Sequence, residues 1–326
     1  ARLKIISGLD ITESRIPQDG RFKVRLDSRE IDFRVSALPI VFGQKFVLRA
    51  LDKSNLSVGL DKLGFSEQPL RLFKEAIAKP FGMILVTGPT GSGKSTTLYS
   101  ILNKLNTPHL NIVTIEDPVE YEIPGITQMQ VKPEIGLTFA SGLRAILRQS
   151  PDVIMIGEIR DSETADTAVK AALSGQLILS TLHTNDASSS ITRLIDMGVE
   201  PFLVASSLIM VCAQRLCRCI CPRCKERVEL SEEFLKTTGF NEKIEFFKGK
   251  GCLFCNQSGY YDRTAILEVL MINDHIREMI IEKKSCDEIK EYAIKELGML
   301  TLRDDAFLKV KQGIITLEEA IRVTTD

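Results

Sequence analysis

The chain has 326 residues, of which 44% are hydrophobic and 26% are charged, and its net charge is −1. This length predicts about two domains with enough apolar surface for a packed core. The near-neutral charge excludes a general electrostatic attraction to nucleic acid or acidic lipid, and no apolar run approaches the roughly 20 residues that span a bilayer. Eight cysteines are too few for a disulfide scaffold, and their clustering indicates metal binding in a reducing compartment, with the cytosol as the expected location.

Residues 1–60 predict a small N-terminal α/β domain that is rich in strands. Apolar and charged residues alternate over 22–26 and again over 31–35, on either side of Asp27-Ser28-Arg29. This period of two predicts a hairpin with one buried and one charged face, and residues 46–48 predict a third strand. Because the chain begins abruptly in polar sequence at Ala1, without a signal-like segment, we expect part of this domain to be missing.

Residues 61–216 predict an α/β domain built on a parallel sheet. A helix is expected after Ser66, ending before Pro80. Short apolar strands are then expected at 83–87, 112–115, 153–156 and 177–180, and helices at 95–105, 139–149 and 162–173. Strands that alternate with helices predict a sheet covered on both faces, with its ligand at the carboxyl edge. Beyond it we expect a cysteine-rich module at 217–260 and a helical region at 261–326.

The end of the first of these strands carries the most informative motif. Residues 88–95 read Gly-Pro-Thr-Gly-Ser-Gly-Lys-Ser, and helix-forming residues follow. Such a loop directs backbone N–H groups at phosphate oxygens, while its lysine reaches the β- and γ-phosphates and its last serine binds Mg²⁺. The sequence therefore predicts a nucleoside triphosphate with Mg²⁺, bound by Gly88, Gly91, Ser92, Gly93, Lys94, Ser95 and Thr96.

Carboxylates follow two of the other strands. Glu116, Asp117 and Glu120 come after the strand at 112–115, and Glu158 comes after the strand at 153–156. Gly157 stands where an ordinary NTPase has an aspartate, so Glu116 or Asp117 is expected to serve the magnesium ion, with Glu120 tuning it. Glu158 is the predicted residue that positions the attacking water, with Glu120 as the alternative. Solvated acidic turns are the competing interpretation of both segments.

A histidine follows a further strand at the same predicted edge. His183 comes after the strand at 177–180, where it can donate to the γ-phosphate, although a lone histidine is more often structural. The chain resembles the secretion ATPases of type II secretion and type IV pilus assembly in a set of short segments. They are the loop at 88–96 and residues 115–120 (Ile-Glu-Asp-Pro-Val-Glu), 148–152 (Arg-Gln-Ser-Pro-Asp), 157–161 (Gly-Glu-Ile-Arg-Asp) and 180–187 (Ser-Thr-Leu-His-Thr-Asn-Asp-Ala).

The resemblance implies a RecA-like P-loop ATPase core that hydrolyses ATP with Mg²⁺. It further implies a ring hexamer at the cytoplasmic face of the inner membrane, held there peripherally by platform proteins of a secretion or pilus machine. The implied function is pseudopilus assembly for type II secretion, with type IV pilus extension as the alternative. In this family the N-terminal domain of one subunit brings arginines to its neighbour's nucleotide. The matching residues are Arg34 and Arg49, with Arg21 as a weaker third, although their alternation alone favours a solvated face.

Four cysteines form two CxxC motifs, here called the two arms: Cys221 and Cys224 in the first, Cys252 and Cys255 in the second. Four thiolates suit a tetrahedral Zn²⁺ site, and the long gap between the arms requires an inserted strand or helix. Cys219 is a competing ligand, and two separate buried or redox pairs are the alternative. The resemblance implies an assembly or export motor, because retraction ATPases of the family lack such a module. A zinc-bearing nucleic-acid translocase is a further alternative, but no aromatic residues interleave the basic ones, so no nucleic-acid partner is expected.

Overall fold

The computed structural model describes residues 1–26, 29–52, 59–238, 240 and 244–325. The chain divides into two compact units, residues 1–58 and 59–326. The division lies close to the predicted boundary at residue 60. Within the described residues, no helix is both long enough and apolar enough to cross a membrane.

The first unit is a short helix, α1 (Arg2–Ile6), and an antiparallel sheet of β1 (Gln18–Leu26), β2 (Arg29–Ile40) and β3 (Gly43–Asp52), in that order. The rings of Phe22 and Phe33 stack with centroids 5.1 Å apart on one face, where Val35 and Ala37 are buried. Charged side chains occupy the other face, because neighbours along a strand point to opposite sides. The predicted hairpin and third strand are confirmed; residues 27–28 of its turn lie outside the described residues.

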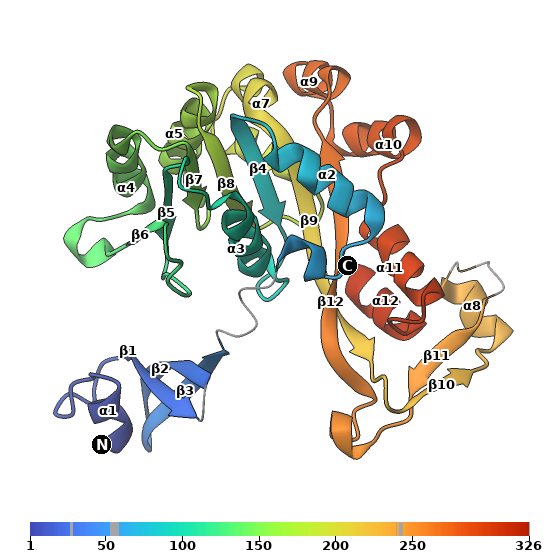
Figure 1. Cartoon of the computed structure of the whole chain (residues 1–326), viewed down its shortest axis with the longest axis horizontal. Helices are drawn as coiled ribbons and strands as arrows, with labels where there is room; N and C mark the ends of the chain where they lie inside the picture. Colours follow the sequence, from blue (N-terminus) through green and yellow to red (C-terminus); the bar gives the residue numbers. More distant parts are fainter. Residues whose placement is uncertain (27–28, 53–58, 239, 241–243, 326) are drawn as a thin grey trace. The chain divides into compact units, whose positions relative to one another are not determined.

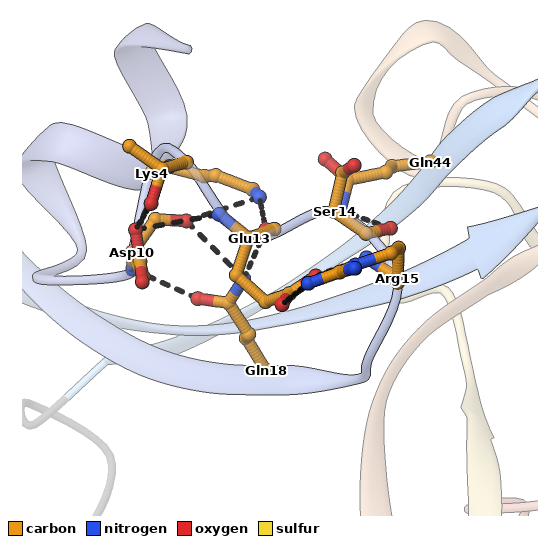
Figure 2. A network of polar contacts seen from close by, with 8 residues as sticks. Lys4, Asp10, Glu13, Ser14, Arg15, Gln18 and Gln44 are labelled. Carbon is orange, nitrogen blue, oxygen red and sulfur yellow. Dashed lines mark hydrogen bonds and ion pairs between the residues drawn. The ribbon is translucent and has the colours of Figure 1, made fainter.

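A polar network holds the segment between α1 and β1 (Figure 2). The Lys4 side chain is buried, and its Nζ donates to the backbone oxygens of Asp10, at 3.1 Å, and Glu13, at 2.5 Å. The Gln18 amide donates to the same two oxygens, while the Asp10 carboxylate accepts from the Thr12 backbone N–H. An ammonium among backbone carbonyls satisfies a charge that burial alone would disfavour, so the network fixes this segment against β1.

The second unit is organised around a seven-stranded sheet with the order β12-β9-β4-β8-β7-β5-β6 (Figure 1). Its strands are β4 (Gly82–Thr87), β5 (Ile112–Glu116), β6 (Thr127–Gln130), β7 (Val153–Ile156), β8 (Leu177–Leu182), β9 (Leu208–Ile220) and β12 (Tyr260–Met271). Neighbouring strands pair in parallel, except that β12 is antiparallel to β9. The strand that leads into the phosphate loop, β4, thus lies between β8 and β9.

Helices cover both faces of this sheet, as predicted. Alternate residues of β4 enter two separate cores: Met83 and Leu85 lie in one, and Ile84 and Val86 in the other. The helices of the parallel region are α2 (Glu67–Ile77), α3 (Lys94–Leu105), α4 (Phe139–Ile146), α5 (Ser162–Leu173), α6 (Ser189–Asp196) and α7 (Pro201–Ser207). The helix predicted over 139–149 changes to a 3₁₀ turn at Leu147–Gln149.

The cysteine arms enclose a small substructure of their own. A two-stranded sheet of β10 (Lys225–Val228) and β11 (Phe246–Gly249), with helix α8 (Glu232–Thr238), fills the gap between the arms, which confirms the predicted insertion. The C-terminal helices are α9 (Asp274–Ile281), α10 (Cys286–Leu297), α11 (Leu302–Lys311) and α12 (Leu317–Thr324). The predicted boundaries at 217 and 261 fall inside β9 and β12, so that finer division stays a prediction.

Candidate active site and metal centre

The phosphate loop joins the end of β4 to the start of α3. Gly88, Gly91 and Gly93 have φ values of +144°, +81° and +89°, a region that side chains disfavour. The Lys94 ammonium donates to the backbone oxygens of Gly88, at 2.8 Å, and Pro89, at 3.0 Å. The loop therefore curls around its own lysine, which leaves the N-terminus of α3 as a site for an anion.

The electrostatics of the loop fit a phosphate ligand. Burial lowers the pKa of Lys94, the Glu158 carboxylate opposes this shift, and the Arg215 guanidinium adds to it. The Ser92 hydroxyl is buried and has no hydrogen-bond partner among the described residues, whereas Ser95 is exposed. Two cations and an unsatisfied buried hydroxyl around an α-helix N-terminus favour a highly charged anion.

Glu158 and His183 meet at the same edge of the sheet. The Glu158 carboxylate lies 2.5 Å from Nη2 of Arg160 and 3.4 Å from Nε2 of His183. Its side chain is 14% exposed, against 50% for His183. The structure thus brings together two residues that the sequence placed on different strands. Those strands, β8 and β7, follow β4 in the order of the sheet, and β4 leads into the phosphate loop.

Short hydrogen bonds between β7, β8 and β4 hold this arrangement. The Thr181 hydroxyl donates to the Gly157 oxygen at 2.7 Å, and the Ile159 N–H donates to the Thr181 oxygen at 3.1 Å. On the other side, Thr87 Oγ1 accepts from the Thr184 N–H at 2.8 Å. A Cβ on Gly157 would make only ordinary contacts, at 3.4 Å and beyond, so nothing in the local packing explains the glycine.

The three predicted carboxylates after β5 occupy different environments. Glu116 is buried, and its carboxylate accepts from Tyr99, from Thr114 at 2.5 Å and from Gln128 at 3.1 Å. Burial and Glu116 raise the pKa of Tyr99. Three protein donors thus engage the Glu116 carboxylate, and its part in a magnesium site stays a prediction. Asp117 is exposed, and its charge raises the pKa of Arg160, as that of Glu158 does more strongly.

Glu120 is half-buried beside the same cluster. Its backbone N–H donates to the Tyr99 hydroxyl at 3.1 Å, so the turn after β5 is fixed from within. The alternative role of Glu120 in positioning water stays a prediction, as does that of Glu158.

The three arginines of the first unit form one row. Arg34 of β2 lies directly opposite Arg21 of β1 and Arg49 of β3, so all three point to the charged face of that sheet. Like charges placed directly opposite weaken strand pairing. The row places three guanidinium groups side by side on one face of this sheet.

The four predicted cysteines form a cluster. The sulfur atoms of Cys221, Cys224, Cys252 and Cys255 all lie within 4.8 Å of one another. The Cys221–Cys252 and Cys224–Cys255 sulfurs are 3.8 Å apart, and the Cys252–Cys255 sulfurs 3.7 Å. Four sulfurs placed tetrahedrally around Zn²⁺, with Zn–S of about 2.3 Å, are about 3.8 Å apart. The donor set and its spacing thus fit a zinc ion.

Two thiols of this cluster have opposite pKa shifts, and burial raises the pKa of Cys224 to about 12. Burial opposes ionisation, but backbone hydrogen bonds at Cys252 and Gly259 lower the pKa of Cys255 to about 6. Cys219 lies on β9, outside the cluster, which argues against it as a competing ligand. Every cysteine in the described residues is free of a disulfide.

Three residues near the phosphate loop were not among the sequence candidates. Arg160 lies in the segment 157–161, where only Glu158 was predicted to act on the nucleotide. Gln214 and Arg215 belong to β9. That strand is buried along most of its length, so it lacks the alternation that identifies a half-buried strand. A local signal for Gln214 and Arg215 is therefore absent from the sequence.

Comparison with known proteins places the chain among secretion and pilus ATPases. Residues 1–322 match the family model described as "Type II/IV secretion system protein". The chain is 53% identical to the type IV pilus assembly ATPase PilB of Myxococcus xanthus, over 98% of this chain and 58% of that protein. It is 49% identical to the type II secretion system protein E of Pseudomonas aeruginosa, over 100% of this chain and 65% of that protein. The chain thus spans less than two thirds of the length of these relatives.

A solved structure gives the same result for the fold. The crystal structure of the pilus retraction motor PilT with bound ADP superposes with a TM-score of 0.71 at 31% identity, covering 96% of this chain and 78% of that one. The predicted fold class, a P-loop core with a small N-terminal domain, a tetracysteine module and C-terminal helices, is confirmed.

Proposed function

The chain belongs to the type II/IV secretion system protein family, and we propose that it is the motor part of an ATPase that powers assembly of a pseudopilus or pilus fibre. The observation that carries this proposal is that Lys94, His183 and Glu158 follow three consecutive strands of one parallel sheet, β4, β8 and β7, with Glu158 and His183 3.4 Å apart. An ATPase needs a phosphate-binding cation, a carboxylate to position water and a group that responds to the γ-phosphate, and these residues supply all three.

The residues act on ATP in the following way. Lys94 would exchange the Gly88 and Pro89 oxygens for oxygens of the β- and γ-phosphates, and the Ser95 hydroxyl would hold Mg²⁺. Glu158 orients the attacking water and accepts its proton. His183, whose Nε2 lies 3.4 Å from the Glu158 carboxylate, would donate to the γ-phosphate and lose that contact on hydrolysis. The change at the end of β8 then reaches the Thr184–Thr87 contact and the strands behind it.

The arginine row completes the site from a second copy of the chain. A cation supplied by a neighbouring subunit stabilises charge on the transferring phosphoryl group, and Arg34 and Arg49 supply it here from their row with Arg21. We propose that the active form is a ring hexamer in the cytoplasm, held at the inner membrane by platform proteins.

Zinc has a structural part in this proposal. Cys221, Cys224, Cys252 and Cys255 would hold Zn²⁺, which cross-links the two arms and ties the β10–β11 substructure to β9 and β12. Four protein thiolates leave no open coordination position, so the ion stabilises this region and takes no part in hydrolysis. The tetracysteine module favours an assembly or export motor over a retraction motor.

A deletion experiment in the source organism is needed to choose between type II secretion and pilus assembly, because relatives of both kinds are similarly close to this chain. The relatives at 53% and 52% identity are named for pilus assembly, and those at 49% and 48% for type II secretion. Type II secretion is the first function to test and pilus extension the second. Deletion of the gene, scored for exoprotein release and for surface pili, distinguishes the two.

The ATPase proposal is tested by two substitutions with a matched control. Lys94→Ala should abolish ATP binding and turnover. Glu158→Gln should still bind ATP while turnover falls by about 100-fold or more, because the water loses its base. Glu134→Gln, an exposed acid outside the site, should behave as the unmodified chain. Normal turnover in Glu158→Gln would transfer the water-positioning role to Glu120, and normal turnover in Lys94→Ala would refute the proposal.

A further inference from the structure

We propose that Gln214 and Arg215, consecutive residues of β9, are a positioning pair that shapes the phosphate loop and ties it to the loop that carries His183. The inference deepens the proposed ATPase function and rests on it. Neither residue belongs to the motifs that identified the nucleotide site. Both come from the strand that flanks β4 on the side opposite β8.

The Gln214 side chain joins the loop to the helix that follows it. Its amide is buried; Nε2 donates to the Ser92 oxygen at 2.8 Å, and Oε1 accepts from the Thr97 hydroxyl at 2.8 Å. A buried amide with both ends satisfied is rigid and costly to disturb. Gln214 therefore fixes the spacing between the turn of the loop and the first turn of α3, which are the two parts that must receive a phosphate together.

The backbone and side chain of Gln214 also explain two of the loop's glycines. A Cβ on Gly88 would lie 2.4 Å from the Gln214 oxygen, and a Cβ on Gly93 would lie 2.8 Å from Gln214 Nε2. Gly91, by contrast, has open space at that position. The phosphate loop thus packs closely against β9 at Gly88 and at Gly93, and Gln214 makes the closest approach at both positions.

Arg215 extends this contact to the His183 loop. Its Nη2 donates to the Asn185 oxygen at 3.0 Å, and its Nη1 lies 3.2 Å from the position of a Cβ on Gly88. Thr184, between Asn185 and His183, is bonded to Thr87 of β4. The loop after β8 is therefore held from two strands, and its position relative to the phosphates depends on the Arg215 guanidinium.

The arrangement predicts separate effects for the two residues. Gln214 acts through the shape of the phosphate loop, so its loss should weaken nucleotide binding. Arg215 acts through the placement of His183, which matters for the γ-phosphate and not for ADP, so its loss should lower turnover more than ADP affinity.

The test for Gln214 combines an isosteric change with a matched control. Gln214→Glu keeps the shape but replaces the N–H donor to the Ser92 oxygen with a carboxylate oxygen. We expect binding of a fluorescent ADP analogue to weaken about tenfold, which corresponds to loss of one buried hydrogen bond. Gln176→Glu makes the same chemical change next to the amino end of β8 and should leave ADP affinity unchanged. Thr97→Val should weaken binding, and Thr97→Ser, which keeps the hydroxyl, should restore it.

The Arg215 arm uses Arg215→Lys, which keeps the charge but lacks the forked guanidinium. ADP affinity should stay within about twofold of the unmodified chain while the turnover number falls about tenfold. Equal affinity in Gln214→Glu and Gln176→Glu, or a loss that follows the melting temperature of the nucleotide-free chain, would overturn the role of Gln214. Unchanged turnover in Arg215→Lys would overturn that of Arg215.

The unmodified chain distinguishes this inference from the proposed function. If it binds ADP and hydrolyses ATP while the variants do the same, only the positioning pair is refuted. If the unmodified chain binds no nucleotide at all, the proposed ATPase function is refuted, and the positioning pair, which rests on it, is refuted as well.

Discussion

Replacement of Glu319 by Gln should destabilise the second unit in a pH-dependent way. Glu319 lies on α12 with a fully buried carboxylate. It accepts from the Arg218 side chain and backbone N–H, at 2.8 Å each, and from Arg322 at 2.6 Å. Burial raises the pKa of Glu319, but the hydrogen bonds from Arg322 and Arg218 outweigh it and lower the pKa to about 2. The contact ties the last helix to β9.

The size of the effect follows from the pKa change. A fall from 4.5 to about 2 corresponds to about 3 kcal/mol of stability at neutral pH. Both guanidinium groups are about half exposed, 49% for Arg218 and 57% for Arg322, so solvent screening should reduce the loss to about 1–2 kcal/mol. Because the folded-state pKa lies below the unfolded one, this contribution is fully present above about pH 5 and disappears as the pH falls towards 2.

Urea unfolding followed by circular dichroism checks this prediction. The difference in unfolding free energy between the unmodified chain and Glu319→Gln should be largest near pH 7 and shrink as the pH approaches about 3. Glu318→Gln, its exposed neighbour on the same helix, should show no such difference. A Glu319→Gln difference that is the same at both pH values, or absent at pH 7, would show that the carboxylate charge does not stabilise α12 on β9.

Two further predictions concern the metal and the arginine row. Cys255→Ser should abolish zinc binding, measured as loss of about one zinc per chain by elemental analysis, whereas Cys219→Ser should retain the metal; zinc retained in Cys255→Ser would exclude the four-thiolate site. Arg49→Glu should lower ATP turnover of the assembled chain about 100-fold or more with little change in ADP affinity, and Lys45→Glu, on the same face of β3, should be near normal; equal turnover in both would remove the row from the mechanism.

The parts of the fold that carry a local signal could be predicted from the sequence. The strands β4, β5, β7 and β8 are short apolar runs, and the hairpin of the first unit shows a clear period of two. The three-stranded register then adds what alternation does not contain: Arg21, Arg34 and Arg49 fall in one row because strand pairing is antiparallel and in step. Alternation fixes which face a residue occupies, whereas register fixes its neighbours.

Long-range pairing decided the rest. β9 and β12 were not expected, because each is a long strand in which an apolar run continues into or follows polar and charged residues. Gln214 and Arg215 were missed together with β9. The acidic segment after β5 reads as one cluster in the sequence, yet Glu116 is buried among Tyr99, Thr114 and Gln128 while Asp117 is exposed. Glu116 is the last residue of β5 and lies inside the sheet, whereas Asp117 begins the loop that follows it.

The sequence by itself contained the chemical groups on which the proposed function rests: the phosphate loop, the acid and histidine at the strand ends, and the four thiols are short patterns whose residue types and spacing predict their ligands. Only the tertiary structure decided how they act together. It paired Glu158 with His183, gathered the four sulfurs to the spacing of a zinc site and pressed β9 against the loop. The physical reason is that these contacts join residues far apart in the chain, and only the packing of the sheet brings them within reach.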